Sequence, residues 1–278
     1  MSRQKRIPKL TGQELRQRQF VRRENGRMIL LFLTRILILA LFFSTWEWAS
    51  QSGAINAFIF SSPSRVWNTL CEWTKQGMLI QHAAVTMRET MVSFLIVSAA
   101  GIAAAILLWR FPFLYQVLEP YLILLNSLPK SALAPLLIVW LGNKPRTIIL
   151  VAVSLAVFSS ILTLYNAFAQ TDSDKIKLIR SLNGNRFHVV QKILIPAGIP
   201  VFISNMKVNI GLCLVGVIIG EFLAAREGLG YLIIYSSQVF KMDWVVTAIL
   251  ILCLIAAVLY LLISAAEISY RRYCLRRK

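Results

Sequence analysis

Charged residues are scarce in this sequence, where they make up 15% of 278 residues, whereas a soluble domain carries about a quarter. Hydrophobic residues reach 57%, and this balance predicts an integral membrane protein built as one helical bundle. The net charge of +18 could suggest nucleic-acid binding. The basic residues, however, lie in the tails and between apolar runs, where topology places them and where they can meet anionic lipid, so no nucleic-acid partner is expected.

Motifs for metal binding and catalysis are also missing. The four cysteines, Cys71, Cys213, Cys253 and Cys274, have no CxxC spacing and no neighbouring histidine, so neither a zinc site nor a disulfide framework is indicated. There is no GxxxxGK[ST] phosphate loop, no HExxH helix and no GxSxG elbow. The sequence therefore predicts no metal, no cofactor and no enzymatic activity, and any ATP that transport consumes would be hydrolysed by another subunit.

Long apolar runs dominate what is present, and a bilayer needs about 20 such residues per helix. The first run is longer than the apolar core of a signal peptide and lacks a good cleavage site, so it is interpreted as a membrane span. Before the second span, Ser61–Val85 has apolar residues at helical spacing after a Ser62-Pro63-Ser64 start signal, which predicts an amphipathic helix at the interface. The pattern predicts six spans: Met28–Trp48, Glu89–Trp109, Tyr121–Leu141, Thr147–Ala167, Pro200–Phe222 and Trp244–Ser264.

Basic residues set the orientation of these spans. An even number of spans puts both tails on one side, and the charge of both tails makes that side the cytoplasm. The polar stretch between spans four and five then also faces the cytoplasm, and the other loops are poorer in charge. The basic residues of the two tails are Arg3, Lys5, Arg6, Lys9, Arg16, Arg18, Arg22, Arg23 and Arg27, and Arg271, Arg272, Arg276, Arg277 and Lys278.

Polar residues and prolines inside the spans are candidates for a transport pathway. Pro129 and Pro135 each free a backbone carbonyl in the third span, which indicates either a tolerated kink or a cavity lining. Asn205, Lys207 and Asn209 lie in the cytoplasmic half of the fifth span. Lys207 is close enough to the membrane surface to extend its ammonium to the headgroups, and the two amides leave an inward polar face open as an alternative.

Glu221 ends the fifth span on the outer side. Two interpretations are open: an ion pair with Arg226 or Lys241, or contact with a substrate near an outer gate. His82 and His188 have no evident ligand partners and are interpreted as surface histidines. The spans are otherwise nearly free of Asp and Glu, which speaks against a proton- or sodium-coupled carrier, because such carriers need acidic groups at mid-membrane.

The polar stretch Gln170–Pro196 has the length of two short helices and a turn. Its basic residues are Lys175, Lys177, Arg180, Arg186 and Lys192, and Pro196 and Pro200 connect it to the fifth span. These features predict a cytoplasmic docking element on a membrane protein.

From about Phe60 to Tyr270 the chain resembles the permease subunits of binding-protein-dependent ABC importers, and within them the nitrate, sulfonate and taurine branch. Besides the loop Gln170–Pro196, three stretches carry the resemblance: Ser62-Pro63-Ser64 with Val66-Trp67, LPKSALAPLLIVWLG from Leu128 to Gly142, and GEFLAAREGLGYLI from Gly220 to Ile234. The family's loop has a Glu-Ala-Ala triplet, a glycine four residues after its last Ala, and an Ile-x-Leu-Pro ending.

This chain keeps the ending of that loop motif, as Ile193 to Pro196, but changes its start. Lys177, Leu178 and Ile179 occupy the triplet positions, and Asn183 occupies the glycine position. Asn is the best substitute for glycine at positive φ, and Gly184 offers a second hinge. The residues that the resemblance assigns to coupling are Lys177, Leu178, Ile179, Leu182, Asn183, Gly184, Ile193 and Pro196, and the altered triplet predicts an unusual groove on the ATPase.

The resemblance implies an all-α, type I importer permease with six transmembrane helices and a cytoplasmic coupling helix. Its domains would be a basic cytoplasmic N-tail (1–27), the permease domain (28–270) and a basic cytoplasmic C-tail (271–278). It would work in the cytoplasmic membrane as a homodimer with ATPase subunits and an extracytoplasmic solute-binding protein, and would import a small sulfonate, nitrate or a vitamin precursor. The rival interpretation is a membrane scaffold or sensor that docks a cytoplasmic partner and moves no solute.

Overall fold

The computed structural model describes residues 12–276, and every regular element in that range is a helix, which confirms the predicted all-α class. Residues 1–11 and 277–278, which include the outermost parts of both predicted basic tails, lie outside the described residues. The chain forms two compact units, Met1–Arg65 and Val66–Lys278.

The first unit contains a single long helix, α1 (Gly12–Gln51), followed by one short turn of helix, α2 (Ala57–Phe60). Since α1 begins at Gly12, much of the predicted N-tail is a continuation of the first span. Within this unit Glu47 accepts hydrogen bonds from the backbone N–H of Ser64 (3.0 Å) and from its hydroxyl (2.9 Å). A carboxylate of the first span therefore caps the start of α3 (Pro63–Lys75).

The amphipathic helix predicted for Ser61–Val85 begins as expected, but the observed helix ends earlier than predicted. The start signal is confirmed, because α3 begins at Pro63, but the helix ends at Lys75. The next helix, α4 (Met78–Arg110), takes up the remainder. Gly77 separates them with a φ of +73°, a conformation that glycine adopts without steric cost.

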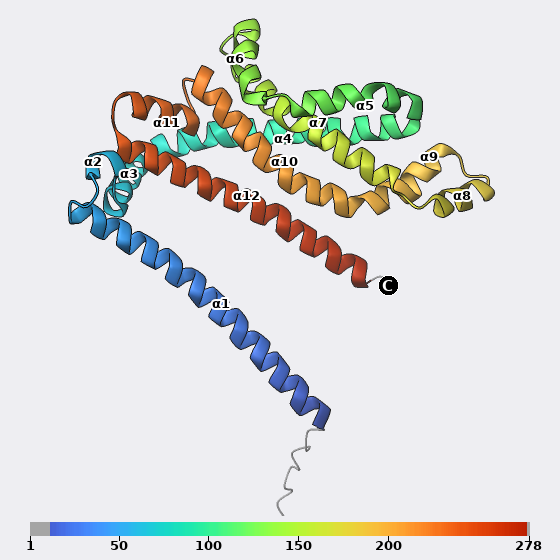
Figure 1. Cartoon of the computed structure of the whole chain (residues 1–278), viewed down its shortest axis with the longest axis horizontal. Coiled ribbons are helices and arrows are strands. Elements are labelled where there is room, and N and C mark those ends of the chain that lie inside the picture. Colours follow the sequence, from blue (N-terminus) through green and yellow to red (C-terminus); the bar gives the residue numbers. More distant parts are fainter. Residues whose placement is uncertain (1–11, 277–278) are drawn as a thin grey trace, which may run out of the picture. The chain divides into compact units, whose positions relative to one another are not determined.

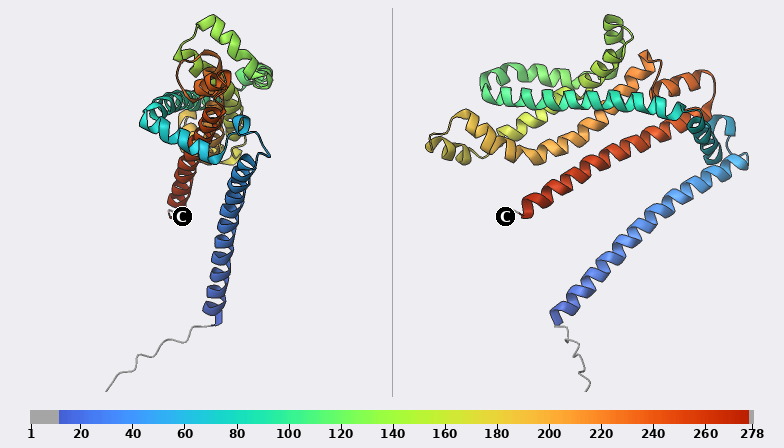
Figure 2. Two further views of the ribbon diagram at one scale, coloured as in Figure 1. Left: turned by 90° about the vertical axis from the view of Figure 1, so that its left-hand side faces the viewer. Right: turned by 180° about the vertical axis from the view of Figure 1, so that it is seen from behind.

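Three helices form the centre of the second unit: α4, α7 (Pro145–Ala169) and α10 (Ile195–Ala224). Both α4 and α10 pack along α7, as Figures 1 and 2 show. The helices α11 (Leu229–Gln238) and α12 (Met242–Arg276) pack against each other and against α10. One buried cluster of this unit consists of Phe94, Val97, Ala156, Ile210, Cys213 and Leu259.

Small residues allow α7 and α10 to approach each other closely. A Cβ added to Gly216 would lie 2.5 Å from the Cα of Ala152, and one added to Gly220 would lie 3.1 Å from the Cα of Ile148. Since lipid is as apolar as the side chains, membrane helices associate mainly through such close packing, and glycines spaced four apart are typical of it.

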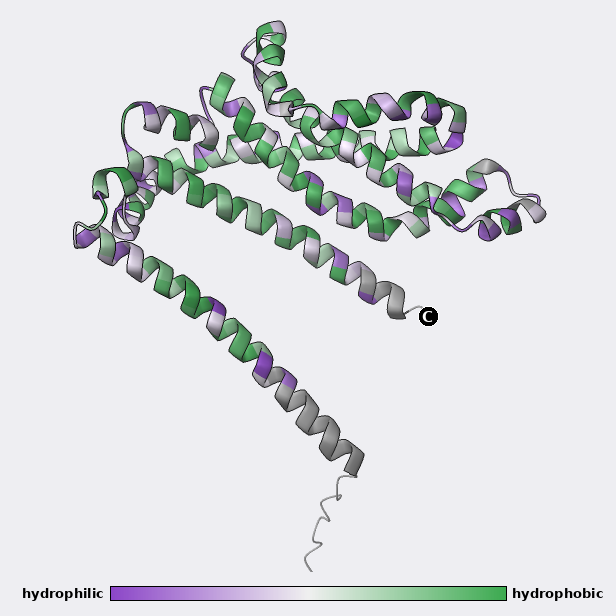
Figure 3. Ribbon diagram, viewed as in Figure 1, coloured by the Kyte–Doolittle hydropathy of each residue, from purple (hydrophilic) through white to green (hydrophobic). Residues whose placement is uncertain are grey.

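Five helical segments are long and apolar enough to cross a membrane: Gly26–Gln51, Met78–Arg110, Pro145–Ala169, Phe187–Ala224 and Met242–Tyr270. Figure 3 shows the apolar colouring along α1 and α12 and the polar colouring of the segment that contains α8 (Ser173–Ser181). Five predicted spans match these helices, with boundaries that shift outward. The sixth predicted span corresponds to two consecutive helices that are separated by a sharp bend.

The third predicted span, Tyr121–Leu141, is wrong as one straight helix. It is broken into α5 (Pro112–Ser127) and α6 (Lys130–Leu141), with an angle of 98° between the two parts. Pro129 causes the break, because it has no N–H to donate and its ring disfavours helical geometry at the residue before it. Leu128 is accordingly extended, with φ −61° and ψ 144°. The described chain therefore has five spans, or six if the bent pair counts as one.

Candidate functional site

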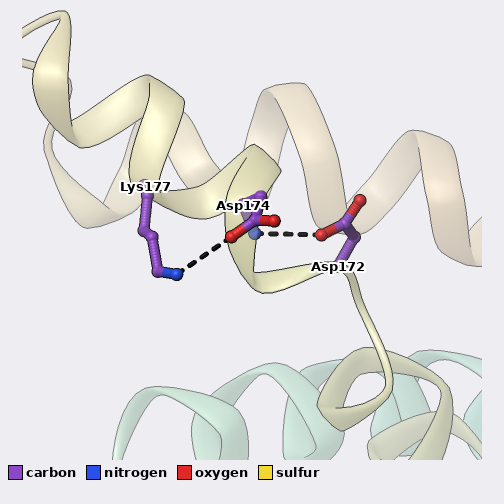
Figure 4. Close-up of polar contacts among 3 residues, drawn as sticks. All are labelled: Asp172, Asp174 and Lys177. Carbon is purple, nitrogen blue, oxygen red and sulfur yellow. Dashed lines mark hydrogen bonds and ion pairs between the residues drawn. The ribbon is translucent and has the colours of Figure 1, made fainter.

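The polar stretch between α7 and α10 contains the predicted two short helices. The first is α8, and its start is capped by Asp172, which accepts a hydrogen bond from the N–H of Asp174 at 2.9 Å. Lys177 forms an ion pair with Asp174 at 2.9 Å, one helical turn earlier (Figure 4). Both side chains are exposed, so the pair contributes at most a few tenths of a kcal/mol. The basic residue at the altered triplet therefore has an acidic partner within its own helix.

The end of α8 confirms the conformation predicted for Asn183. This residue has a φ of +59°, and the N–H of the following Gly184 donates to the carbonyl of Ile179 at 2.9 Å. Together these are a Schellman motif with asparagine in the left-handed position, where glycine is more common. Gly184 itself is not left-handed, so it is no second hinge of that kind. Its small size is needed instead, because a Cβ there would lie 2.7 Å from the Ile179 carbonyl oxygen.

The second short helix, α9 (Arg186–Val189), continues without a break into α10. Asn185 and His188 cap its start reciprocally, each accepting the other's backbone N–H, at 3.0 and 3.2 Å. His188 is exposed, as predicted. A π-helical turn, η1 (Val190–Leu194), precedes Pro196, and in it the N–H of Ile195 donates to the carbonyl of Val190. The wider turn accommodates the proline, which cannot donate and would otherwise crowd a carbonyl.

The apolar side chains of this segment are either packed or exposed. One set packs on α4 and α7 through Val189, Ile193 and Leu194, with Ile176 and Ile179 partly buried beside them. Three other apolar side chains of the segment are exposed: Leu178, Leu182 and Phe187, with exposed fractions of 61%, 75% and 68%. We call these three residues the apolar docking face. The structure thus separates the predicted coupling residues: Ile179 and Ile193 hold the segment in place, whereas Leu178 and Leu182 are available to a partner.

The amides predicted for a pathway lie between α7 and α10. Asn205 and Asn209 are 5% and 1% exposed, and both donate to the hydroxyl of Ser160, at 2.8 and 3.0 Å. The two amides therefore tie the helices together from inside the packed unit. Their pathway role stays a prediction, as does that of Pro129 and Pro135, which both lie at exposed positions.

Lys207 has a charged partner on another helix, and its extension to the headgroups stays a prediction. Its ammonium forms an ion pair with Glu267 of α12 and lies 5.5 Å from the ring centre of Tyr260. An opposite charge and an aromatic face offset the cost of keeping a cation in the membrane. Sequence reasoning missed Glu267 because the sixth span was predicted to end at Ser264, whereas α12 continues to Arg276.

Glu221 pairs with neither Arg226 nor Lys241, so the ion-pair interpretation is wrong. The carboxylate is 1% exposed and accepts hydrogen bonds from the Thr86 hydroxyl (2.7 Å) and the N–H of Gly230 (2.6 Å). The start of α11 offers unpaired N–H groups, and a buried carboxylate satisfies one of them directly. The ion pair is not formed because Arg226 and Lys241 remain at the exposed surface.

Two neighbours complete this capping cluster at the start of α11. The Thr86 hydroxyl accepts from the N–H of Leu229 at 2.8 Å, and His82 Nδ1 accepts from the N–H of Gly228 at 3.0 Å. His82 is only 8% exposed, so its interpretation as a surface histidine is wrong. Three consecutive N–H groups are thus each satisfied by a side chain of α4 or α10, which fixes the loop before α11 to the bundle.

The chain resembles known membrane transport proteins over most of its length. The sequence profile described as "Binding-protein-dependent transport system inner membrane component" matches residues 97–272. A probable ABC transporter permease protein of Haemophilus influenzae is 29% identical over 233 residues, which are 84% of this chain and 94% of that protein. A putative aliphatic sulfonates transport permease protein, SsuC of Bacillus subtilis, is 23% identical over 84% of this chain and 85% of its own length.

A solved structure shows the same fold. It is an inward-facing form of the MetNI methionine ABC transporter, one chain of which aligns with a TM-score of 0.63. The alignment covers 70% of this chain and 97% of that chain, at 15% sequence identity. The helical bundle described above is therefore the bundle of an ABC importer permease.

Proposed function

Since this chain belongs to the family of inner-membrane components of binding-protein-dependent transport systems and is an ABC importer permease, we propose that it works as a homodimer with two cytoplasmic ATPase subunits. An extracytoplasmic binding protein would deliver the solute, and the ATPases would supply all hydrolysis. The apolar docking face supports this proposal most directly, because it exposes three large apolar side chains: Leu178 and Leu182 lie between two candidate spans, and Phe187 is the first residue of the span Phe187–Ala224.

Basic residues support a cytoplasmic position for this loop and for both ends of the chain. Lys175, Lys177 and Lys192 lie in the loop, and the two tails carry most of the other positive charges. Cytoplasmic segments next to membrane spans are enriched in Lys and Arg. The proposed location is the cytoplasmic membrane, with α8 as the coupling helix.

The solute proposed for this permease is a small sulfonate, nitrate or a vitamin precursor. The relative from Bacillus subtilis is a putative aliphatic sulfonates transport permease protein, which supports the first of these. A solute-binding protein would hold most of the specificity, so the ligand of that partner is the most informative quantity to measure.

Docking energy should come from burial of the apolar docking face. Removing a Leu or Phe side chain from water stabilises a complex by about 1.5–3 kcal/mol. A groove that accepts Leu178, Leu182 and Phe187 must be apolar and wider than one built for the small Glu-Ala-Ala triplet. The segment below the face is well anchored through Val189 and Leu194, so movement of the face would be transmitted to α10.

Replacing Leu182 by aspartate is expected to abolish stable association with the ATPase, because a carboxylate would enter a dry groove. The measurement is co-purification of the full-length permease with its ATPase subunit, followed by solute-stimulated ATP hydrolysis. Leu182→Met, which keeps an apolar side chain of similar volume, is the control and should retain both properties. If the aspartate variant associated with the ATPase as well as the unchanged protein does, the docking face would not be the ATPase contact. A complex that hydrolyses ATP but imports no solute would support the rival interpretation of a membrane scaffold.

Replacing Gly184 by valine is expected to reduce transport and ATPase stimulation at least about tenfold while membrane insertion stays intact. Any Cβ at this position meets the Ile179 carbonyl at 2.7 Å, so the end of α8 must rearrange. Solute uptake and ATPase stimulation measure coupling, and protease protection of the tails measures insertion. Unchanged coupling in a correctly inserted variant would contradict the assignment of this loop.

A further inference from the structure

An apolar groove of about 230 Å³ lies in the second unit, next to the segment that carries the docking face. Helices α4, α7 and α10 each form part of it, and each belongs to a segment that is long and apolar enough to span a membrane. The groove offers a polar solute only aliphatic and aromatic side chains, so a hydrocarbon is the better match. The side chains of the lining are those of Ile102, Leu164, Phe168, Ile195, Ile199 and Phe202.

The groove extends along α10, away from the docking face. It begins at Ile195, three residues after the exposed Lys192, and Phe202 lies seven residues further along the helix. At 1.5 Å per residue this distance is about 10 Å. Gly198 keeps the groove deep, because a Cβ there would lie 2.7 Å from Cε1 of Phe168. Since acyl chains and spanning helices both cross the bilayer, a chain can lie along α10 in this groove.

Basic residues lie near the end of the groove at Ile195. Lys192 is exposed, and so is Arg110, which ends α4 about two turns beyond the groove residue of that helix. The five basic residues of Gln170–Pro196 outnumber its two acidic residues, Asp172 and Asp174, one of which already has an ion pair. A negative headgroup at this level would therefore gain more attraction than repulsion.

We propose that the groove holds an acyl chain of an anionic phospholipid, whose headgroup lies beside Lys192 and Arg110. A second copy of this chain is a less suitable occupant. The same patch of both copies meets in a two-fold contact, so the two basic loops would face each other and repel. The binding site is independent of the proposed importer assembly.

The bound chain would also regulate coupling, and this part of the inference rests on the proposed function. Phe168 and Phe202 of the groove pack in the same cluster as Ile193 and Leu194, which hold the docking segment in place. An acyl chain in the groove supplies van der Waals contacts to these walls, whereas an unfilled groove leaves them without partner atoms. Loss of the lipid should therefore loosen the anchor of the docking face.

The test uses the full-length permease alone, in nanodiscs of phosphatidylglycerol or phosphatidylethanolamine that carry a photoreactive group on one acyl chain. Mass spectrometry of the digested protein locates the adducts. Adducts at Ile195, Ile199 and Phe202 are expected to exceed those at Leu262, which is 63% exposed on α12. They should be about fivefold or more frequent with the anionic lipid, the ratio that one nearby cation provides. Equal labelling of Leu262, or equal labelling by both lipids, would show boundary lipid only and would overturn the proposal.

Variants of the groove separate its occupants. Ile199→Trp places a larger ring in the groove and should remove most adducts at Ile195 and Phe202, whereas Leu262→Trp adds the same ring outside it and should leave them unchanged. Adducts that persist in Ile199→Trp would place the chain elsewhere. Ile199→Cys tests the second copy: a disulfide-linked dimer formed in the membrane would assign the groove to that copy and contradict the lipid site.

The effect on coupling is measured on the complex with its ATPase. Replacing phosphatidylglycerol by phosphatidylethanolamine should reduce solute-stimulated ATP hydrolysis of the unchanged complex but not of Ile199→Trp, where the ring fills the groove in either lipid. If the complex assembles and is stimulated but the groove takes up no lipid, then the site is wrong and the proposed function stands. If lipid adducts form as expected but no ATPase associates, then the site stands and the importer assembly is wrong.

Discussion

Replacing Gly216 by alanine is expected to destabilise the protein by about 1–3 kcal/mol, although glycine to alanine usually stabilises a helix. The new Cβ would lie 2.5 Å from the Cα and 3.0 Å from the Cβ of Ala152. A backbone atom cannot rotate away as a side chain can, so α7 and α10 must separate. The gain in helix propensity from glycine to alanine is about 1 kcal/mol or less. The larger steric cost therefore makes the net change in stability unfavourable.

The control for this change lies on the same helix. Gly211→Ala adds the same atom to α10 at a position where nothing lies within 4 Å, so the variant should be neutral or slightly more stable. Thermal unfolding of the purified full-length variants, followed by tryptophan fluorescence in one detergent, gives the comparison. If the two variants had the same melting temperature, close contact between α7 and α10 would not be a source of stability.

Replacing Glu221 by alanine is expected to cost about 3 kcal/mol or more. The change leaves the N–H of Gly230 buried without an acceptor and removes the nearer of two acceptors of the Thr86 hydroxyl, the other being the His82 carbonyl oxygen at 3.3 Å. Each stranded buried group costs about 1–3 kcal/mol, and the missing side chain leaves a cavity as well. Because the cluster also fixes the loop before α11, proteolysis within residues 225–230 should become faster.

Two variants separate this capping role from a general effect of charge. Glu221→Gln keeps one carbonyl acceptor for the N–H of Gly230 and should recover part of the lost stability. Glu227→Ala removes an exposed carboxylate six residues later and should change the melting temperature little. Thermal unfolding and limited proteolysis measure both. Full stability of Glu221→Ala would show that the start of α11 is capped in another way.

Local patterns predicted the helical class and five of the spans. Hydropathy determines which segments enter the membrane, and Asn183 could be assigned a left-handed conformation because few residue types tolerate it. The break at Pro129 was foreseen as a kink, but its size depends on what packs around α5 and α6, which no local pattern contains.

Contacts between distant parts of the chain escaped prediction. Glu221 binds Thr86, which lies 135 residues earlier, and Lys207 finds Glu267 on another helix. The sequence near Glu221 offers two basic residues, so an ion pair was the natural local expectation. Likewise, the segment from Leu178 to Gly184 shows no period long enough to separate the partly buried Ile179 from the exposed Leu182.

The uninterrupted helix from Phe187 to Ala224 has a mechanical consequence. With 38 residues it forms a rod of about 57 Å that begins in the docking face and ends three residues after Glu221. When one end of such a helix is displaced, the helix tilts as a whole and its other end moves too. A tilt of about 5° about its middle would displace each tip by about 2.5 Å. A partner that moves Phe187 would therefore also move the opposite end of this helix, where Glu221 caps the start of α11.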